Sequence, residues 1–317
     1  MSQRILFITS TRIGDAILST GLLGHLIGEY PGAKVTVACG PAAAPLFEAV
    51  PNLERIIVLD KMVFSLHWTM LLGACAGRLW EVVVDLRNSP MYYLLAARRR
   101  WRIGRTGEPE HRVRQLAGVL GLDKPPFPRL WTAETHIQEA RRLIPDGPPV
   151  LAVGPTANWR AKTWRAGRFA ELIERLCAPG GILPGARVAV FGRDDELPQA
   201  LRLINAIPEA RCINLVGRVG LLDAFACMER CAFYVGNDSG LMHLAAASGI
   251  PTLGLLGPSR EELYAPWGTN CATVRTAASF DDIHPPGFDH LTSDTLMDGL
   301  SVERAAQAVG ELWERAR

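Results

Sequence analysis

The chain has 317 residues, which is longer than a usual single domain and predicts two domains of roughly 150 residues each. Its 34 Lys and Arg against 32 Asp and Glu leave a formal charge of +2, which argues against a nucleic-acid coat while leaving a local basic patch open. An uncharged run at residues 240–259 contains a histidine, prolines and glycines, which disfavours a membrane-spanning helix.

The N-terminal half alternates apolar runs with segments of helical spacing. Its first run, RILFIT, enters a strand with no signal-peptide pattern before it, so we expect a cytoplasmic protein. A helical pattern then covers residues 16–30 and ends at a Pro-Gly pair. The strands expected in this half are residues 4–9, 34–39, 55–60 and 82–87. Continuous β-branched strands separated by helices predict an α/β fold with a parallel sheet, which is Rossmann-like.

A second series of strands follows a polar, proline-rich break at residues 144–149. We therefore predict a boundary near residue 148, with an N-terminal domain at 1–148 and a C-terminal domain at 149–317. The strands expected in the second domain are residues 150–154, 187–192, 212–217, 233–238 and 252–257. The last 17 residues predict a terminal helix with Ser301 as N-cap, which we expect to pack back on the N-terminal domain.

The turn Asn237-Asp238-Ser239-Gly240 joins an apolar strand to a helix, and its backbone N–H groups form a helix N-terminus that favours an anion. Gly240 leaves room for a phosphate, and His243 projects from the first helical turn. Asp238 repels a phosphate, so it caps the helix or orients a donor group. The alternative is an ordinary N-cap with a satisfied histidine. Ligands of two Rossmann-like domains are expected in the cleft between them, at the carboxyl ends of the strands.

Other candidate sites carry less weight. The chain has neither G-x-G-x-x-G after its first strand nor a P-loop motif, which disfavours a dehydrogenase or a P-loop enzyme. The seven cysteines are scattered among apolar residues and are interpreted as core residues rather than metal or redox groups. The acidic run Asp194-Asp195-Glu196 suggests a metal site, but adjacent acids at a helix start more often interact with the helix dipole. We therefore predict no metal site.

Three motifs together resemble glycosyltransferase family 9, the heptosyltransferase-like enzymes of bacterial envelope synthesis. They are VGNDSGLMHLAAASGIPTLGLLGPS, the opening RILFITSTRIGDAILSTGLLGHLIGEYPGAKVTVAC, and PTANWRAKTW in the middle of the chain. The resemblance implies a GT-B fold of two facing Rossmann-like domains. It also implies inverting, metal-independent transfer of a sugar, commonly from ADP-heptose onto lipopolysaccharide core, with no cofactor besides the donor substrate.

The resemblance also assigns donor-binding residues in the C-terminal domain. Asp238, Ser239, Gly240 and His243 would hold the diphosphate and neighbouring groups of the nucleotide-sugar. Lys162 would be the cation that stabilises the departing diphosphate. Thr156 is a weaker candidate for the same pocket, and Glu196 would contact the donor ribose. The turn Gly257-Pro258-Ser259 would border the phosphates. Where the family often has Trp-Pro, this chain has Trp164-Arg165, which leaves the local loop shape open.

Asp15 matches the proposed catalytic aspartate of the family. Glycosyl transfer needs a base for the acceptor hydroxyl, and the departing diphosphate needs little acid help, so one carboxylate is enough. The alternative for Asp15 is an N-cap role, which does not exclude catalysis. The N-terminal domain also has an arginine run, which is either a solvated face or a contact with an anionic glycan, a glycolipid or a membrane surface. The run contains Arg98, Arg99, Arg100, Arg102, Arg105, Arg112 and Arg114.

Three other functions stay open at this stage. A sugar-nucleotide epimerase or hydrolase would use the same two-domain plan without an acceptor, since fold alone does not decide the reaction. A noncatalytic sugar-nucleotide binding protein is disfavoured by the presence of Asp15 and Lys162. A dehydrogenase is the least favoured of these three alternatives. The sequence leaves the sugar, the nucleotide base and the acceptor open, and it predicts no nucleic-acid partner.

Overall fold

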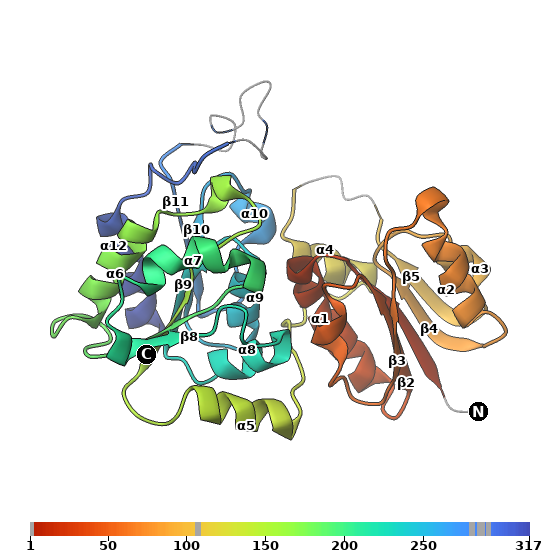
Figure 1. Ribbon diagram of the computed structural model, residues 1–317. Coiled ribbons are helices and arrows are strands. Elements are labelled where there is room, and N and C mark those ends of the chain that lie inside the picture. The colour runs from red at the N-terminus through yellow and green to blue at the C-terminus, as the bar shows by residue number, and fades with distance from the viewer. Residues whose placement is uncertain (1–2, 105–108, 279–282, 284–288, 290–292) are drawn as a thin grey trace. The chain divides into compact units, whose positions relative to one another are not determined.

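The computed structural model describes residues 3–104, 109–278, 283, 289 and 293–317 of the chain. The chain divides into two compact units, Met1–Ala133 and Glu134–Arg317, and each has a parallel sheet of its own (Figure 1). The predicted α/β class with two Rossmann-like domains is therefore confirmed. Within the described residues, no helix combines the length and the apolar character that crossing a membrane requires.

The first unit is built on a five-stranded sheet in the order β3-β2-β1-β4-β5. Its strands are β1 (Arg4–Ile8), β2 (Lys34–Cys39), β3 (Leu53–Val58), β4 (Trp80–Asp85) and β5 (Ala97–Arg102). Its helices are α1 (Ile13–Glu29), α2 (His67–Cys75), α3 (Met91–Leu94) and α4 (Arg112–Val119), with 3-10 turns η1 (Ala44–Phe47) and η2 (Val63–Ser65). Every strand pair is parallel, so all five strands end at the same edge of the sheet.

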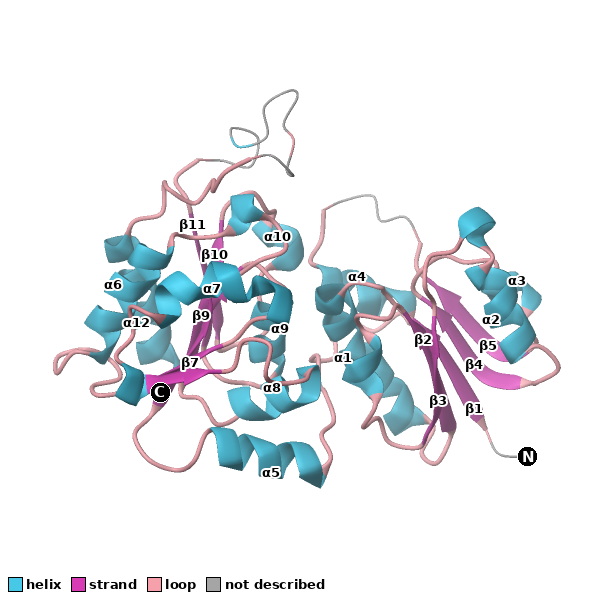
Figure 2. Cartoon of the chain, in the orientation of Figure 1, coloured by secondary structure: helices cyan, strands magenta, loops and turns pink. Residues whose placement is uncertain are grey.

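Alternate residues of the central strands pack under different helices, which is why β1 is apolar from Ile5 to Ile8 after its first residue. Leu6, Ile8 and Val83 pack with residues of α2 and α3 on one face of the sheet. Helices α1 and α4 pack together on the other face (Figure 2). Strand β5 was not predicted, because its sequence ARRRWR has four arginines and lacks the continuous apolar run expected of a buried strand. It forms at the edge of the sheet, where arginine side chains can reach solvent.

The second unit has a six-stranded sheet in the order β11-β10-β9-β6-β7-β8. Its strands are β6 (Val150–Gly154), β7 (Arg187–Val190), β8 (Cys212–Asn214), β9 (Phe233–Asn237), β10 (Thr252–Leu256) and β11 (Cys271–Arg275). Its main helices are α5 (Glu134–Leu143), α6 (Ala166–Cys177), α7 (Leu197–Ile204), α8 (Leu221–Met228), α9 (Gly240–Ala247), α10 (Glu261–Tyr264) and α12 (Val302–Ala316). Its 3-10 turns are η3 (Arg160–Lys162), η4 (Asp194–Glu196) and η5 (Glu209–Arg211).

The two faces of this sheet are covered by different helices. Leu151, Phe233 and Leu253 belong to a core that also contains the apolar faces of α6, α7 and α12. Helix α9 packs on β9 and β10 and touches α8, which in turn packs against α5. All strand pairs are again parallel, so the loops after β6, β7, β9 and β10 leave the sheet at one edge.

The expected boundary between the domains needs correction. The division lies between Ala133 and Glu134 rather than near residue 148, because α5 packs against α8 of the second unit. The proline-rich break at 144–149 therefore follows the first helix of that unit instead of preceding the unit. The terminal helix α12 was expected to pack back on the N-terminal domain. It is part of the second unit, where Val309 and Leu312 are buried in the core.

Candidate active site

The site lies at the carboxyl edge of the second sheet, where the order of the strands reverses. The chain runs outward from β6 through β7 to β8, then returns to place β9 on the other side of β6. Ligands of open parallel sheets bind at such a switch point. Gly154 of β6 and Gly236 of β9 face each other across it, and the Tyr234 side chain occupies the space that their Cβ atoms would need. The floor of the site is therefore closely packed.

Asn237 ties together the two loops that leave this switch point. Its side chain is fully buried, and its Nδ2 donates to the Pro155 carbonyl at 2.8 Å. Its Oδ1 accepts from the backbone N–H of Trp164 at 3.1 Å. Residues 155 and 164 bracket the loop after β6, so the amide of Asn237 holds both ends of the loop that carries Lys162. Asn237 is thus a structural residue of the site.

Asp238 is the buried centre of a set of polar contacts. Its Oδ2 accepts from Lys162 Nζ at 2.6 Å and from the Ser259 hydroxyl. Burial raises the pKa of Asp238, but the Lys162 charge, the two hydrogen bonds and the nearby His243 together outweigh burial and hold that pKa below its ordinary value. Asp238 is therefore an ionised carboxylate that orients the Lys162 ammonium, as one of the two predicted roles requires.

The helix after this turn begins with Ser239 as its N-cap residue, and no side-chain capping bond is formed there. Gly240 is the first residue of α9, and His243 lies in the first turn with only 5% of its surface exposed. The cap therefore falls on Ser239, and the side chain of Asp238 points to Lys162 and Ser259 instead. The expectation that Asp238 either caps the helix or orients a donor is resolved in favour of orientation.

Thr156 and Glu196 meet on the neighbouring strand ends. The Thr156 hydroxyl donates to Glu196 Oε2 at 2.8 Å, and the backbone N–H of Arg193 donates to the same oxygen at 2.9 Å. Thr156 is buried, and Glu196 has a side chain that is 13% exposed. The loops after β6 and β7 are thus linked by a carboxylate whose other oxygen faces Arg193 at 3.4 Å. This places Glu196 beside the switch point.

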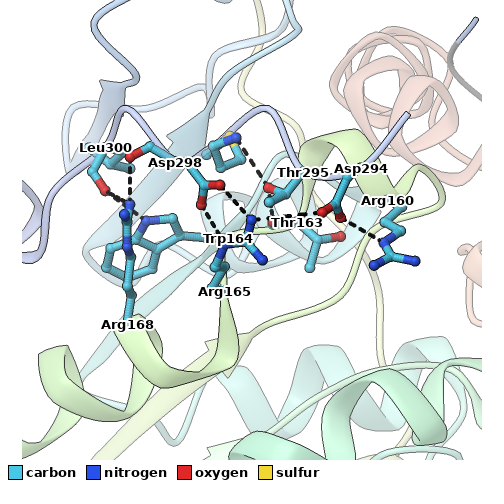
Figure 3. A network of polar contacts seen from close by, with 10 residues as sticks. Arg160, Thr163, Trp164, Arg165, Arg168, Asp294, Thr295, Asp298 and Leu300 are labelled. Carbon is cyan, nitrogen blue, oxygen red and sulfur yellow. Dashed lines mark hydrogen bonds and ion pairs between the residues drawn. The ribbon is translucent and has the colours of Figure 1, made fainter. Parts of the chain in front are cut away.

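The Lys162 loop is also held from the C-terminal side, by residues 294–300 (Figure 3). Arg165 forms a two-pronged ion pair with Asp298, with N–O distances of 2.6 and 2.5 Å. Trp164 Nε1 donates to the Leu300 carbonyl at 3.0 Å, and Arg160 pairs with Asp294 at 2.9 Å. The Trp164-Arg165 departure from the family pattern is therefore accommodated by an ion pair that a proline could not make.

Asp15 lies in the first unit, in the loop-to-helix segment after β1. It is the third residue of α1, and Arg12 is the N-cap, so the N-cap alternative for Asp15 does not hold. Arg112 Nε of α4 lies 3.9 Å from Asp15 Oδ1. Burial raises the pKa of Asp15, and the charges of Arg112 and Arg12 lower it in part, so the net shift is upward. A carboxylate with a raised pKa is a better proton acceptor.

The chain is similar to known proteins over most of its length. The model of glycosyltransferase family 9 (heptosyltransferase) matches residues 84–281, which is more than half of the chain. The chain belongs to glycosyltransferase family 9. It is 26% identical to lipooligosaccharide heptosyltransferase 2 of Haemophilus influenzae, over 86% of this chain and 88% of that protein. It is also 26% identical to lipopolysaccharide heptosyltransferase 2 of Escherichia coli, over 89% and 90%.

Solved structures show that this family 9 chain has the GT-B fold of its relatives. The E. coli ADP-heptose lipopolysaccharide heptosyltransferase II superposes with a TM-score of 0.75 at 21% identity, covering 99% of both chains. A family 9 glycosyltransferase from Veillonella parvula gives a TM-score of 0.77 at 21% identity, covering 98% of this chain and 97% of that one. The predicted family and fold are therefore confirmed, and the chain is a glycosyltransferase.

The arginine run of this glycosyltransferase is divided between two elements of the first unit. Arg98 pairs with Glu81 of β4, and Arg112 pairs with Asp15. The guanidinium of Arg102 lies over the rings of Tyr92 and Tyr93, at 5.1 and 5.2 Å from their centroids. Arg105 lies outside the described residues. The run is thus split between the edge strand β5 and the start of α4.

The sequence reasoning missed two contributors to the site. Arg112 was counted with the run, but its contact with Asp15 depends on the packing of α4 against α1, which no local pattern reveals. Trp159 lies under Lys162, with the ammonium 4.9 Å from its ring centroid. Its place three residues before Lys162 in NWRAK was the only available signal. No group of three or more metal-binding side chains occurs in the described part of the chain.

Proposed function

We propose that this glycosyltransferase moves heptose from ADP-heptose onto the lipopolysaccharide core or a related envelope glycan, with inversion at the sugar. Support comes from the curated relatives named lipopolysaccharide and lipooligosaccharide heptosyltransferase 2, which align over most of both chains. A related E. coli heptosyltransferase structure contains ADP and has a TM-score of 0.70 to this chain. The observation that carries the proposal is the buried Lys162–Asp238 pair at the switch point of the second sheet.

The second unit supplies the donor site in this proposal. An ammonium has three N–H donors, and Asp238 takes one of them, so Lys162 can donate the others to the diphosphate. The N-terminus of α9, with Ser239, Gly240 and His243, would bind phosphate oxygens, as helix N-termini do. Thr156 and Glu196 would contact the ribose or the diphosphate. Because Lys162 is held by Asp238 and Glu196 is held by Thr156, little reorganisation of these groups is needed when charge develops on the departing ADP.

Asp15 would act as the general base. The acceptor hydroxyl oxygen bonds to the anomeric carbon while the bond from that carbon to the diphosphate breaks. The hydroxyl proton goes to the Asp15 carboxylate, and the electron pair leaves with ADP. A single carboxylate suffices because ADP is stabilised by Lys162 rather than by a proton. We propose on the same ground that the reaction requires no divalent metal, with no cofactor besides the donor.

The test is a transfer assay with ADP-heptose and core-stage lipopolysaccharide acceptors, with ADP release and glycan mass both measured. Transfer should add one heptose per ADP released, and enzyme treated with a chelator should keep its rate. ADP release without acceptor would identify a hydrolase, and an isomerised donor would identify an epimerase. Transfer from another nucleotide-sugar, with none from ADP-heptose, would contradict the assigned donor. Loss of activity in chelator with recovery on adding a metal would contradict metal independence.

A further inference from the structure

An exposed apolar surface projects from the first unit, at the segment between β3 and α2. It consists of Met62, Val63, Phe64, Leu66 and Met70, and we call it the apolar tip. Phe64 is 94% exposed and Val63 is 75% exposed. Burial of such side chains stabilises a fold, so their exposure forgoes that stabilisation in the isolated chain. Exposed apolar clusters of this kind mark interaction sites.

The backbone of the apolar tip is a hydrogen-bonded turn. Phe64 and Ser65 both have positive φ, at 51° and 58°, a conformation that bulky side chains rarely adopt. The turn is closed by hydrogen bonds from Ser65 N to the Met62 carbonyl and from Leu66 N to the Val63 carbonyl, at 3.1 and 3.2 Å. Thr69 Oγ1 bonds to the Leu66 carbonyl at 2.7 Å, which attaches the turn to α2. Unfavourable backbone geometry and exposed aromatic surface therefore occur together at Phe64, as they do at functional sites.

Pairs of a cation and an aromatic ring occur in the segments that follow this turn in the chain. Arg87 lies over the Trp68 ring at 5.0 Å, and Arg102 lies over Tyr92 and Tyr93. Residues 60–104 contain seven Lys and Arg against three Asp and Glu, whereas the whole chain has 34 against 32. Of these cations, Lys61, Arg87 and Arg102 lie at the carboxyl edge of the sheet with the apolar tip, whereas Arg78 and Arg98 pair with Glu54 and Glu81 at the opposite edge.

This surface shares its edge of the sheet with Asp15. The apolar tip follows β3, Arg87 follows β4, Arg102 ends β5, and Asp15 follows β1. All of these strands are parallel, so their carboxyl ends lie along one edge. The Asp85 carboxylate fixes the loop after β4 by accepting from the backbone of Arg87 and from the Ser89 hydroxyl, at 2.9 and 2.7 Å. The aromatic and cationic groups are thus held in place beside the proposed acceptor side.

We propose that the apolar tip inserts into the interface of an anionic phospholipid bilayer, with Val63 and Phe64 among the acyl chains and Lys61, Arg87 and Arg102 at the headgroup level. Apolar residues at a tip, Trp and Tyr behind them and basic residues around them match the layers of a membrane interface. The inference rests on the proposed function in one respect, since a glycolipid acceptor would be carried by that bilayer.

Co-sedimentation of the full chain with vesicles tests this surface. Vesicles of neutral phosphatidylcholine are compared with vesicles that contain about 30% anionic phosphatidylglycerol, at about 0.1 M and about 0.5 M salt. The protein should partition onto the anionic vesicles and be released in part by the higher salt. The double variant Val63→Ser, Phe64→Ser should bind them about tenfold more weakly, because two inserted apolar side chains are lost. Its thermal stability should stay unchanged, since both side chains are exposed.

Two matched controls carry the same kind of change elsewhere. Leu201→Ser and Phe127→Ser replace side chains that are 41% and 44% exposed outside the apolar tip, and both variants should bind vesicles like the wild type. Equal binding by wild type and the double variant, or no binding to anionic vesicles, would overturn the proposal. So would equal binding to neutral vesicles, because the basic residues would then play no part.

Measurements of ADP binding, heptose transfer and vesicle binding together distinguish this proposal from the proposed function. If ADP binds and heptose is transferred to a delipidated acceptor while vesicles are ignored, the membrane surface is wrong and the function stands. If vesicles bind through the apolar tip but no heptose is transferred, the surface stands and the function is wrong. The double variant should keep its ADP affinity, because the donor residues lie in the second unit.

Discussion

The two units each end their strands in polar loops, but the loops differ in how their charges are arranged. In the second unit Asp238 and Lys162 form a 2.6 Å pair with side chains only 9% and 17% exposed. In the first unit the cation that lies within 4 Å of Asp15, among the described residues, is Arg112 at 3.9 Å, and the edge strand β5, two strands away from β1, presents exposed arginines. The second edge is therefore preformed and paired, whereas the first is open and strongly basic.

This difference fits the two substrates of the proposed reaction. A nucleotide diphosphate has a fixed geometry and charge, so a site whose donors are already held by Asn237, Asp238 and Asp298 can meet it without rearrangement. An acceptor glycolipid offers one reacting hydroxyl among many groups, and an open edge with a carboxylate of raised pKa can receive it. Substitutions at the second edge should therefore change stability and donor affinity together. Substitutions at the first edge should change turnover alone.

The largest effect is expected from Asp15→Asn, which keeps the size of the side chain but removes the proton acceptor. Turnover should fall by about 10²- to 10⁴-fold, the usual contribution of a positioned base, while ADP affinity and melting temperature stay near wild type. The measurement is the transfer rate at saturating donor, with ADP titration alongside. Asp123→Asn, a change at an exposed carboxylate of the same unit, is the control. A near wild-type rate in a chemistry-limited assay would show that Asp15 is not the base.

Lys162→Ala should lower both ADP affinity and stability, because it leaves the buried Asp238 carboxylate without its cation. We expect the affinity for ADP to fall about tenfold or more. We expect the free energy of unfolding to fall by about 2 kcal/mol or more. The exposed Lys124→Ala is the control. Unchanged stability together with lost affinity would mean that the pair is a ligand contact without a structural role, which would weaken the contrast between the two edges.

The pH dependence of that stability loss has a definite sign. In the wild type the folded-state pKa of Asp238 is depressed, so the contribution of the pair is present above about pH 4 and is lost as the pH falls through the folded-state pKa. In Lys162→Ala, burial remains without the cation, so protonation stabilises the fold. The gap in unfolding free energy between the two proteins should therefore narrow in acid. Urea unfolding at several pH values measures this, and a gap that widens in acid would reverse the assignment.

Gly236→Ala tests the rigidity of the second edge with a smaller expected effect. The added Cβ would collide with the Tyr234 hydroxyl and lie 2.8 Å from the Gly154 carbonyl oxygen. We expect a loss of about 1 to 3 kcal/mol, which Tyr234→Phe in the same chain should reduce in part. Gly167→Ala in α6 meets no atom within 4 Å and is the control. An unchanged melting temperature in Gly236→Ala would show that Tyr234 and the neighbouring backbone can move to make room for the added methyl group.

The smallest effect is expected from Arg112→Gln. The Arg112 charge lowers the pKa of Asp15 against the effect of burial, so its removal raises that pKa further. The acid limb of the turnover profile should move to higher pH, and the shift should be small because the pair is partly exposed and screened. Turnover well above the limb should change little. A shift of the acid limb to lower pH, or no shift, would show that the Arg112 charge does not lower the pKa of Asp15.

Local pattern was enough to predict most of the strands and the residues at their ends. Continuous β-branched runs such as VVVDLR can be buried only in a sheet covered on both faces, so parallel sheets followed from the sequence. Asp238 could be named because it follows such a run, whereas Asp15 and Lys162 were named through the family resemblance of the motifs that contain them. Strand β5 could not be predicted, because an edge strand does not need apolar side chains.

The sequence by itself determined the fold class, the family and the residues at the strand ends, because these depend on spacing of a few positions along the chain. Only the tertiary structure decided which of those residues meet. Lys162 and Asp238 are 76 positions apart, Arg165 and Asp298 are 133 apart, and Arg112 reaches Asp15 through the packing of α4 on α1. An ion pair of this kind depends on strand order and helix packing, and these arise from burial summed over whole units rather than from any local run of residues.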